Sequence, residues 1–329
     1  MKAPLRLGLA LGGPTGRDAV RAGWARLLER AAFAEELGFH SVWVPEGHFR
    51  RGAMASPLVA LSAVAARTRR IGLGTTSLLL PIHHPLRVAE EVAALDALSD
   101  GRVLLGLGRG FAAPIFQAFR VQSATKRDRF DEALDAIRAA WSGAPLTLDG
   151  VHFATRGEHA AALRPVQRPH PPLLVAAFGR KGLLQAARHG LPYLASPLEP
   201  LDLLAENYAF HRESLAPGVS LAPFAAPVMR TLHVAADAAE ARAVLDRLDA
   251  EAAATAGALP PALVRAAAGP ASARAIVGEA SAVADALARY RERLGLDLLV
   301  VRSEVSGLDE PAQRRSLEAL ATRVLPALG

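Results

Sequence analysis

The segments SVWVPEGHF (residues 41–49), IGLGTTSLLLPIHHP (residues 71–85) and GRVLLGLGRG (residues 101–110) decide the fold of this chain. Each contains a short apolar run that stops at a glycine, a histidine or a Gly-Arg-Gly turn, and each leads into a segment with helical spacing. Buried strands that alternate with helices are typical of a parallel β/α barrel, in which the chemistry lies where the strands end. The polar residues that end these runs are therefore the first candidates for a functional site.

The same alternation of apolar runs and helical segments continues over the whole chain. We expect eight strands, at Leu5–Leu11, Ser41–Pro45, Ile71–Leu79, Val103–Gly108, Leu173–Ala177, Tyr193–Ala195, Pro227–Ala235 and Asp297–Arg302. A helix follows every strand except the last, and a closing helix is expected at Glu310–Leu328. We therefore predict the α/β class, as a single (β/α)8 TIM barrel over residues 1–329.

Two insertions are expected in this barrel. One, after the fourth strand, is the excursion of residues 142–172, with a small hairpin at Leu146–Phe153, and the other, after the seventh strand, is a lid loop at residues 255–277. Loops of this length inside a compact domain are usually functional or form an added subdomain. A doubly wound dinucleotide-binding sheet fits less well, because the glycines of residues 106–110 lack the G-x-G-x-x-G spacing.

Composition limits the function of this 329-residue chain. Hydrophobic residues make up 51%, which supports a large core, and the absence of cysteine excludes disulfides, thiolate metal sites and a cysteine nucleophile. No signal peptide and no apolar run of about 18 residues is found, so we expect a soluble, cytoplasmic protein without a membrane partner. The net charge of +6 comes from scattered arginines, which favours no nucleic-acid partner.

The adjacent pair His83 and His84 suggests a metal site at first sight. Neighbouring residues in an extended segment point apart, however, and no carboxylate or third histidine follows at ligand spacing. We therefore expect no metal there.

Several longer motifs occur in a fixed order along the chain. The most specific are GTTS (residues 74–77), LPIHHP (80–85), LDALSDGR (95–102) and LGLGRG (105–110), with support from AEELGFHSVWVPEGHF (34–49), ARHGLP (187–192) and GEASAVADAL (278–287). In order and spacing, these motifs resemble the bacterial luciferase-like flavin-dependent monooxygenases. The resemblance runs from the first strand to the C-terminal helix.

Members of the family that the chain resembles hold reduced flavin at the carboxyl-terminal mouth of the barrel. The resemblance implies an oxidoreductase: an FMN-dependent monooxygenase of the two-component kind, which uses O2 to oxygenate a small apolar organic substrate. It also implies a separate NAD(P)H flavin reductase and a homodimer. Two alternatives stay open. One is an F420-dependent hydride-transfer enzyme, since F420 has a polyglutamate tail and the chain is basic; the other is a flavin-binding homologue that lacks catalysis.

Arg109, between Gly108 and Gly110, follows the fourth strand. A guanidinium group pairs bidentately with a phosphate, and glycines let that phosphate approach the backbone. The resemblance implies that Arg109 contacts the flavin phosphate. The alternative is a solvated arginine in a glycine turn.

A second basic turn, Gly179-Arg180-Lys181, lies between the fifth strand and its helix. Backbone N–H groups at a helix N-terminus attract anions, and two cations strengthen that attraction. The resemblance places part of the phosphate site here, although the family usually has small hydroxyl residues in this loop. The alternative is a basic surface turn.

Thr76 and Ser77 end the third strand. The resemblance implies a cis peptide bond between them, at a bulge under the flavin ring, so both are candidate cofactor-binding residues. The alternative is a pair of ordinary hydroxyls at a strand end.

Glu46, Gly47, His48 and Phe49 end the second strand. Relatives commonly have two adjacent histidines here, of which the first is associated with catalysis, and in this chain that position is Gly47. His48 is then the candidate catalytic acid or base, because imidazole exchanges protons near neutral pH. A histidine bonded to the backbone is the alternative. Glu46 is a candidate cofactor-binding residue, and Gly47 leaves space for a larger substrate.

Candidate residues for the substrate pocket share a position just beyond a strand end. They are Gly47, His83, Phe111, Phe116 and Ser196. Phe111, Phe116 and the nearby Phe119 either form an apolar wall or pack under their loop, and their spacing does not decide between the two.

Overall fold

A computed structural model describes residues 4–13, 20–50, 52–255, 257, 264 and 268–328. The chain forms two compact units. The first comprises Met1–Ala10, Ala34–Ser41 and Leu174–Gly329, and the second comprises Leu11–Phe33 and Val42–Leu173. The predicted site residues are thus divided between two units.

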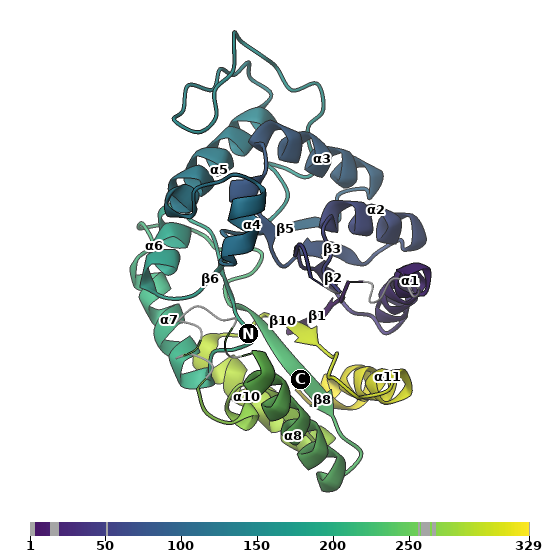
Figure 1. Ribbon diagram of the computed structural model, residues 1–329. Coiled ribbons are helices and arrows are strands. Elements are labelled where there is room, and N and C mark those ends of the chain that lie inside the picture. The colour runs from purple at the N-terminus through teal and green to yellow at the C-terminus, as the bar shows by residue number, and fades with distance from the viewer. Residues whose placement is uncertain are drawn as a thin grey trace. The chain divides into compact units, whose positions relative to one another are not determined.

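The second unit contains the strand ends that the sequence singles out. Its elements are α1 (Val20–Glu36, which ends in the first unit), β2 (Ser41–Val44), α2 (Pro57–Arg67), β3 (Gly72–Thr75), β4 (Leu78–Leu79), the 3-10 helix η1 (Leu80–Ile82), α3 (Pro85–Leu98), β5 (Val103–Gly108), α4 (Ala113–Ala118), the 3-10 helix η2 (Ser123–Thr125) and α5 (Lys126–Ser142). Both β3 and β4 pair in parallel with β5. Figure 1 shows α2, α3 and α5 packed in sequence order around these strands.

Trp43 explains why the neighbouring strands are rich in glycine. Its side chain is fully buried, and a Cβ atom on Gly74 would overlap its ring. A Cβ atom on Gly106 would overlap the carbonyl oxygen of Thr75. Glycine within a strand marks such a close approach. Strands β3 and β5 therefore have glycine at the positions where the Trp43 ring and the Thr75 carbonyl oxygen occupy the space of a side chain.

The LDALSDGR motif has a structural role. Asp96 is buried and accepts hydrogen bonds from the backbone N–H and the side-chain Nε2 of Gln167. The guanidinium group of Arg102 donates to the carbonyl oxygens of Ala65, Thr68, Ile71 and Ser99. These bonds join the loops at the start of β5, which is the end of the strand opposite to Arg109.

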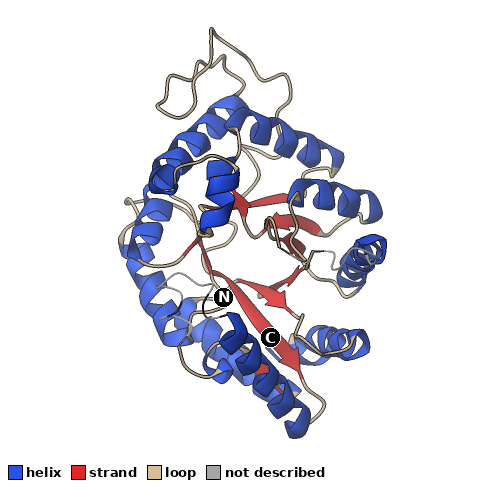
Figure 2. Cartoon of the chain, in the orientation of Figure 1, coloured by secondary structure: helices blue, strands red, loops and turns tan. Residues whose placement is uncertain are grey.

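The first unit contains the remaining strands. Its elements are β1 (Arg6–Ala10), β6 (Leu173–Ala177), α6 (Arg180–Arg188), β7 (Tyr193–Ala195), α7 (Leu201–Glu213), β8 (Pro227–Val234), α8 (Ala238–Thr255), the 3-10 helix η4 (Ala271–Ala273), β9 (Ile276–Gly278), α10 (Ala280–Leu294), β10 (Leu298–Arg302), α11 (Glu310–Ala319), the π-helix η5 (Leu320–Val324) and the 3-10 helix η6 (Pro326–Leu328). Parallel pairs join β1 to β10, β10 to β8, β6 to β7, and β7 to β8. In Figure 2, helices and strands alternate along this unit as predicted.

The strand order confirms the predicted (β/α)8 barrel. Pairing runs β10-β1-β2-β3-β5-β6-β7-β8, and β8 pairs in turn with β10, which closes the sheet. A continuous parallel sheet whose first and last strands meet is the defining feature of this fold.

Two strand predictions are corrected by the structure. The predicted strand Ile71–Leu79 is divided into β3 and β4 at Thr76–Ser77, whose peptide bond is cis, as the resemblance implied. The segment predicted as the lid loop 255–277 contains the short strand β9, because Ile276 is buried and pairs with Leu232 of β8. Much of that predicted lid, at residues 256, 258–263 and 265–267, lies outside the described residues.

The predicted excursion 142–172 is a long loop after α5 (Figure 2). Isolated antiparallel bridges join Leu146 to His159 and Asp149 to Ala154, so the predicted hairpin extends further than Phe153. Glu132 of α5 accepts hydrogen bonds from the backbone N–H groups of His152 and Phe153, which fixes the hairpin to the helix.

Among the helices that the structure describes, none has the length and apolar character needed to cross a membrane.

Candidate functional site

Glu46 holds two histidine rings at the carboxyl end of β2. Its Oε1 atom lies 2.8 Å from Nε2 of His48 and 2.8 Å from Nε2 of His83, and its Oε2 atom accepts a hydrogen bond of 2.6 Å from the backbone N–H of Leu79. The side chain of Glu46 has no exposed surface. We call Glu46, His48 and His83 the carboxylate–imidazole cluster.

The surroundings of Glu46 favour its charged form. Burial acts to raise the pKa of Glu46, but the hydrogen bond and charge of His83, the N–H of Leu79 and the hydrogen bond of His48 together hold it below its usual value. A carboxylate only accepts hydrogen bonds, so both rings present Nε2–H to it. The Nδ1 atom of each ring is then left on the opposite edge to exchange a proton.

The two histidines differ in access to solvent. The side chain of His83 is 31% exposed, whereas that of His48 is 9% exposed. The ring of His48 is covered by Phe119, in an edge contact with 5.0 Å between ring centres, and by Phe49 at 5.7 Å. His84 turns away to Phe153, so the adjacent pair diverges as predicted.

Gly47 does not face an empty space. A Cβ atom at this position would lie 3.2 Å from Nη2 of Arg50 and 3.6 Å from the Cβ of Ala53. The guanidinium group of Arg50 therefore takes up part of the room that the sequence predicted for a larger substrate. The N–H of Gly47 donates to the carbonyl oxygen of Met54, which closes the loop after β2.

Three cations gather where β5 ends. Burial and the charge of Arg127 lower the pKa of Arg109 to about 10, while Asp131 acts in the opposite direction. Burial and the charges of Arg109 and Arg127 also lower the pKa of Lys126. We call Arg109, Lys126 and Arg127 the cation cluster. Like charges at this distance repel one another, so the cluster favours an anion.

The cation cluster is held by the turn that follows β5. Lys126 Nζ donates a hydrogen bond of 3.2 Å to the carbonyl oxygen of Gly110 and lies 5.4 Å from the centre of the Phe116 ring. Sequence reasoning missed Lys126 and Arg127. The signal was the run KRDR at residues 126–129, which begins α5, but the contact between that helix and the glycine turn is visible only in three dimensions.

The glycines beside Arg109 permit close approach of backbone and neighbouring groups. A Cβ atom on Gly108 would overlap Oγ of Ser77, and Gly110 has a φ of 68° with Phe116 directly beneath it. Phe116 is buried, whereas Phe111 is 46% and Phe119 is 40% exposed. The turn thus packs on Phe116, and the other two rings are open to a ligand.

Thr76 offers an unsatisfied polar atom next to this turn. Its hydroxyl oxygen is buried and has no hydrogen-bond partner among the described residues. The preceding Thr75 hydroxyl, in contrast, donates to the carbonyl oxygen of Gly106 at 2.7 Å. Buried polar atoms are normally paired, so an orphaned hydroxyl at a strand end marks a place where a ligand completes the bonding.

In the first unit, the predicted basic turn begins α6. Gly179 has a φ of 71° and precedes the helix, whose first residues are Arg180 and Lys181. The Arg180 guanidinium stacks on Phe210, 4.4 Å from the ring centre, and the side chain of Lys181 is exposed. The helix N-terminus expected from the sequence is therefore present, with one of its two cations engaged by an aromatic ring.

Ser196, also in the first unit, belongs to a tight turn after β7. Its N–H donates to Oε2 of Glu199, and its hydroxyl accepts from the N–H of Leu198. The buried Arg230 donates to the carbonyl oxygens of Ser196 and Glu199. Burial raises the pKa of Glu199, although Tyr193 and Arg230 oppose it. This network fixes the turn that carries Ser196.

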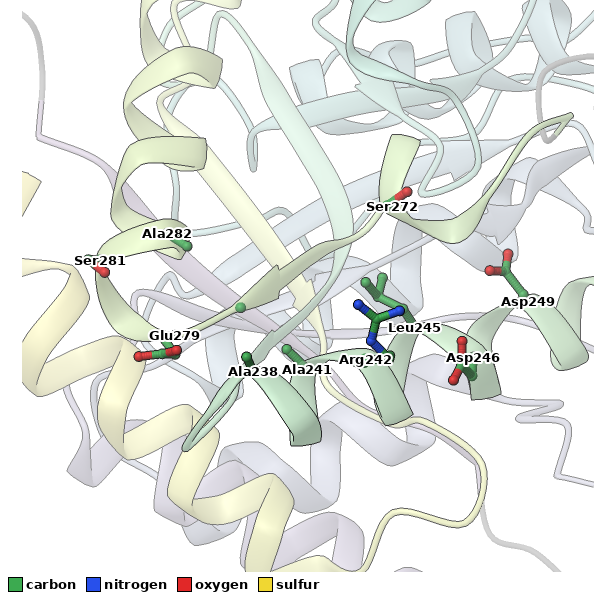
Figure 3. Close-up of a pocket in the computed structure, with 11 residues that line it drawn as sticks. Ala238, Ala241, Arg242, Leu245, Asp246, Asp249, Ser272, Glu279, Ser281 and Ala282 are labelled. Atoms are coloured by element: carbon green, nitrogen blue, oxygen red, sulfur yellow. The ribbon is translucent and has the colours of Figure 1, made fainter.

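A separate pocket of about 540 Å³ lies in the first unit between α8 and α10 (Figure 3). Arg242, Asp246 and Asp249 of α8 line it together with Ser272 and Glu279. Asp249 already accepts a hydrogen bond from the N–H of Ala271. None of the residues predicted for the site lines this pocket.

Comparisons with known proteins identify the family of the chain. A family model described as luciferase-like monooxygenase matches residues 5–297. The chain is 32% identical over 189 residues to 4-hydroxyprotoasukamycin monooxygenase of Streptomyces nodosus subsp. asukaensis, covering 57% of this chain and 51% of that protein. It is 29% identical over 196 residues to the oxygenase component of the flavin-dependent trigonelline monooxygenase of Acinetobacter baylyi, covering 57% and 52%. The chain spans about half the length of the curated relatives it matches.

Solved structures match over nearly the full length. Monooxygenase RslO1 from Streptomyces bottropensis has a TM-score of 0.82 and 27% identity, covering 99% of this chain and 100% of that one. The oxygenating constituent of 3,6-diketocamphane monooxygenase from Pseudomonas putida, in complex with FMN, has a TM-score of 0.85 and 19% identity, covering 99% of each chain. The second likeness shows the fold alone.

Proposed function

The chain belongs to the luciferase-like monooxygenase family, and we propose that it is an FMN-dependent monooxygenase that oxygenates a small apolar organic substrate with O2. The observation that carries this proposal is the cation cluster at the end of β5. Burial and the charge of Arg127 lower the pKa of Arg109, burial and the charges of Arg109 and Arg127 lower that of Lys126, and Asp131 opposes the shift of Arg109. A phosphate dianion relieves this repulsion and accepts charge-assisted hydrogen bonds from the guanidinium groups.

The residues around the cation cluster fit a flavin. Gly108 and Gly110 flank Arg109 and let the turn pack closely on Ser77 and Phe116, which holds Arg109 beside Lys126. The orphaned hydroxyl of Thr76 supplies a hydrogen-bonding group for the ring system, with Ser77 beside it. We assign the phosphate to the cation cluster and the ring to the side of Thr76, Ser77 and Glu46. The helix end at Gly179, Arg180 and Lys181 in the first unit is proposed as a further anion-binding position.

Reduced FMN, when bound, supplies the electrons for the reaction with O2, so the protein supplies binding, orientation, proton handling and exclusion of water. The exposed rings of Phe111 and Phe119 provide apolar surface for the substrate, and Phe116 supports the turn beneath them. Gly47, His83 and Ser196 remain proposed pocket residues, and His48 remains a proposed acid or base.

The proposed reaction needs a source of reduced flavin. The similarity to the oxygenase component of a flavin-dependent monooxygenase supports a two-component system. We therefore propose a separate NAD(P)H flavin reductase as partner, and a homodimer as the assembled form.

Binding of cofactors to the purified protein tests the proposal. Reduced FMN, riboflavin and reduced F420 are titrated anaerobically, with quenching of protein fluorescence as the readout. Tight binding of reduced FMN, much weaker binding of riboflavin and weak binding of F420 support the FMN-dependent oxygenase. Tight binding of F420 instead makes the protein a hydride-transfer enzyme, and binding of none of them contradicts a flavin site.

A further inference from the structure

Two imidazole rings share one oxygen of Glu46, and only one of them is open to a ligand. We propose that the site takes an aromatic compound with an acidic hydroxyl, a phenol, and that Nδ1 of His83 accepts the hydroxyl proton. This inference rests on the proposed function, for which it names the substrate class and the base.

Access distinguishes His83 from His48. Both rings present Nε2 to the same Oε1 atom at 2.8 Å, so their bonds to Glu46 do not separate them. His83 has 31% of its side chain exposed, while His48 lies beneath Phe49 and Phe119 with 9% exposed. We therefore place the base at His83, and the acid or base role proposed above for His48 is the alternative that the test decides.

The charge on Glu46 suits a proton acceptor at His83. The side chain of Glu46 is fully buried, and its Oε1 atom lies 2.8 Å from Nε2 of His83, so the carboxylate holds the ring with Nδ1 on the opposite edge. Other charged or titratable groups of the described residues also lie near the cluster. His48 shares Oε1, Arg50 lies beside Gly47, and Arg129 donates to the carbonyl oxygen of Pro81, two residues before His83.

Exposed aromatic rings beside the cluster favour an aromatic substrate. Phe49 is 70% exposed and has a φ of 58°, which turns a large apolar side chain towards solvent. Its ring centre lies 6.0 Å from that of Phe119. Aromatic rings pair in tilted or offset arrangements at such distances, so the pair offers a surface on which a further ring packs.

The acidity of a phenol matches a histidine base. Proton transfer is efficient when donor and acceptor have similar acidity near the working pH, which favours a phenol over an alcohol or a C–H group. The phenol O–H bond breaks and an Nδ1–H bond forms on His83, leaving a phenolate and an imidazolium beside Glu46. Reduced flavin, when bound, would supply two electrons and two protons, so that one atom of O2 enters a ring C–H bond as a hydroxyl group and the other leaves as water, and His83 would return its proton to the phenolate oxygen of the product.

4-Nitrophenol tests the proposal without flavin, because its phenolate absorbs visible light and the phenol does not. The full-length protein is mixed with 4-nitrophenol, and its ionisation is followed against pH. We expect bound 4-nitrophenol to ionise about one pH unit lower than free 4-nitrophenol, a tenfold change in the ionisation equilibrium. His83→Gln abolishes the shift, since the glutamine amide replaces Nε2–H towards Glu46 but accepts no proton.

Three further variants complete the test. His48→Gln, the matched control on the other ring, keeps most of the shift, and Phe49→Ala weakens binding of 4-nitrophenol about fivefold without changing the melting temperature. Loss of the shift in His48→Gln but not in His83→Gln assigns the base to His48 and overturns the proposal. A shift that is absent from the unmodified protein overturns it as well. Binding of reduced FMN to the same samples is measured separately, so failure of the flavin proposal is recognised independently.

Discussion

Arg109 has the most specific role in the proposed function, since it lies half-buried between Gly108 and Gly110 in the cation cluster. Its pKa of about 10 keeps the guanidinium charged at neutral pH despite the repulsion of Arg127. We expect Arg109→Ala to weaken the binding of reduced FMN by about 10-fold to 100-fold, because hydrogen bonds between charged groups are lost. The binding of riboflavin, which has no phosphate, should weaken much less. Fluorescence titration measures both ligands. Equal losses for FMN and riboflavin would remove the phosphate contact.

Glu46 links stability to pH at the same scale. The pKa of Glu46 is lower in the folded protein than its usual value of 4.5. The ionised carboxylate therefore stabilises the folded state at a pH above the unfolded pKa, and this stabilisation is lost as the pH falls through the folded pKa. We expect Glu46→Gln to unfold more easily near neutral pH and to lose less stability than the unmodified protein as the pH falls below the unfolded pKa. Urea unfolding followed by circular dichroism at several pH values measures this. A pH dependence that is unchanged in Glu46→Gln contradicts the linkage.

At the scale of elements, α5 begins with cations where a helix prefers anions. Lys126 and Arg127 lie in its first turn together with Asp128, and the positive end of the helix dipole disfavours the two cations. We expect Arg127→Gln to leave the melting temperature unchanged or to raise it by about 1–3 °C, because one unfavourable cation is removed from the helix start. The same change should weaken the binding of reduced FMN several-fold.

The control for α5 is Arg87→Gln, which removes an exposed guanidinium that bonds to Glu91 on α3. This change should alter neither FMN affinity nor, beyond about 1 °C, the melting temperature. Differential scanning fluorimetry and FMN titration on both variants give the comparison. A clear fall in melting temperature for Arg127→Gln, with unchanged FMN affinity, would make Arg127 a structural residue.

For the whole molecule, the net charge of +6 bears on how an anionic cofactor arrives. Positive proteins attract anions over about 10 Å at 0.1 M salt, and added salt screens that attraction. We expect the association rate of reduced FMN to fall about tenfold between roughly 10 mM and 500 mM salt. Neutral riboflavin should show little change. Stopped-flow fluorescence measures both rates, and an identical salt response for the two flavins would exclude electrostatic steering.

The sequence by itself determined the barrel and most of the strand ends that carry the proposed site. Strands and helices are recognised from the local spacing of apolar residues, and a single sequence shows this spacing directly. Arg109, Thr76 and Ser77 could be singled out because each ends a recognisable run. The lid segment was less predictable, because the pairing of Ile276 with Leu232 joins residues far apart in the chain.

Only the tertiary structure decided which side chains act together. His48 and His83 lie 35 residues apart in sequence numbering, yet both bond to Glu46, and a single sequence does not state which loop meets which strand end. Lys126 and Arg127 reach Arg109 because α5 begins beside the Gly110 turn, again through packing rather than spacing. The fold class follows from the local pattern of apolar residues. The contacts within the site follow from packing, because contacts between distant segments depend on all the surfaces that the fold buries.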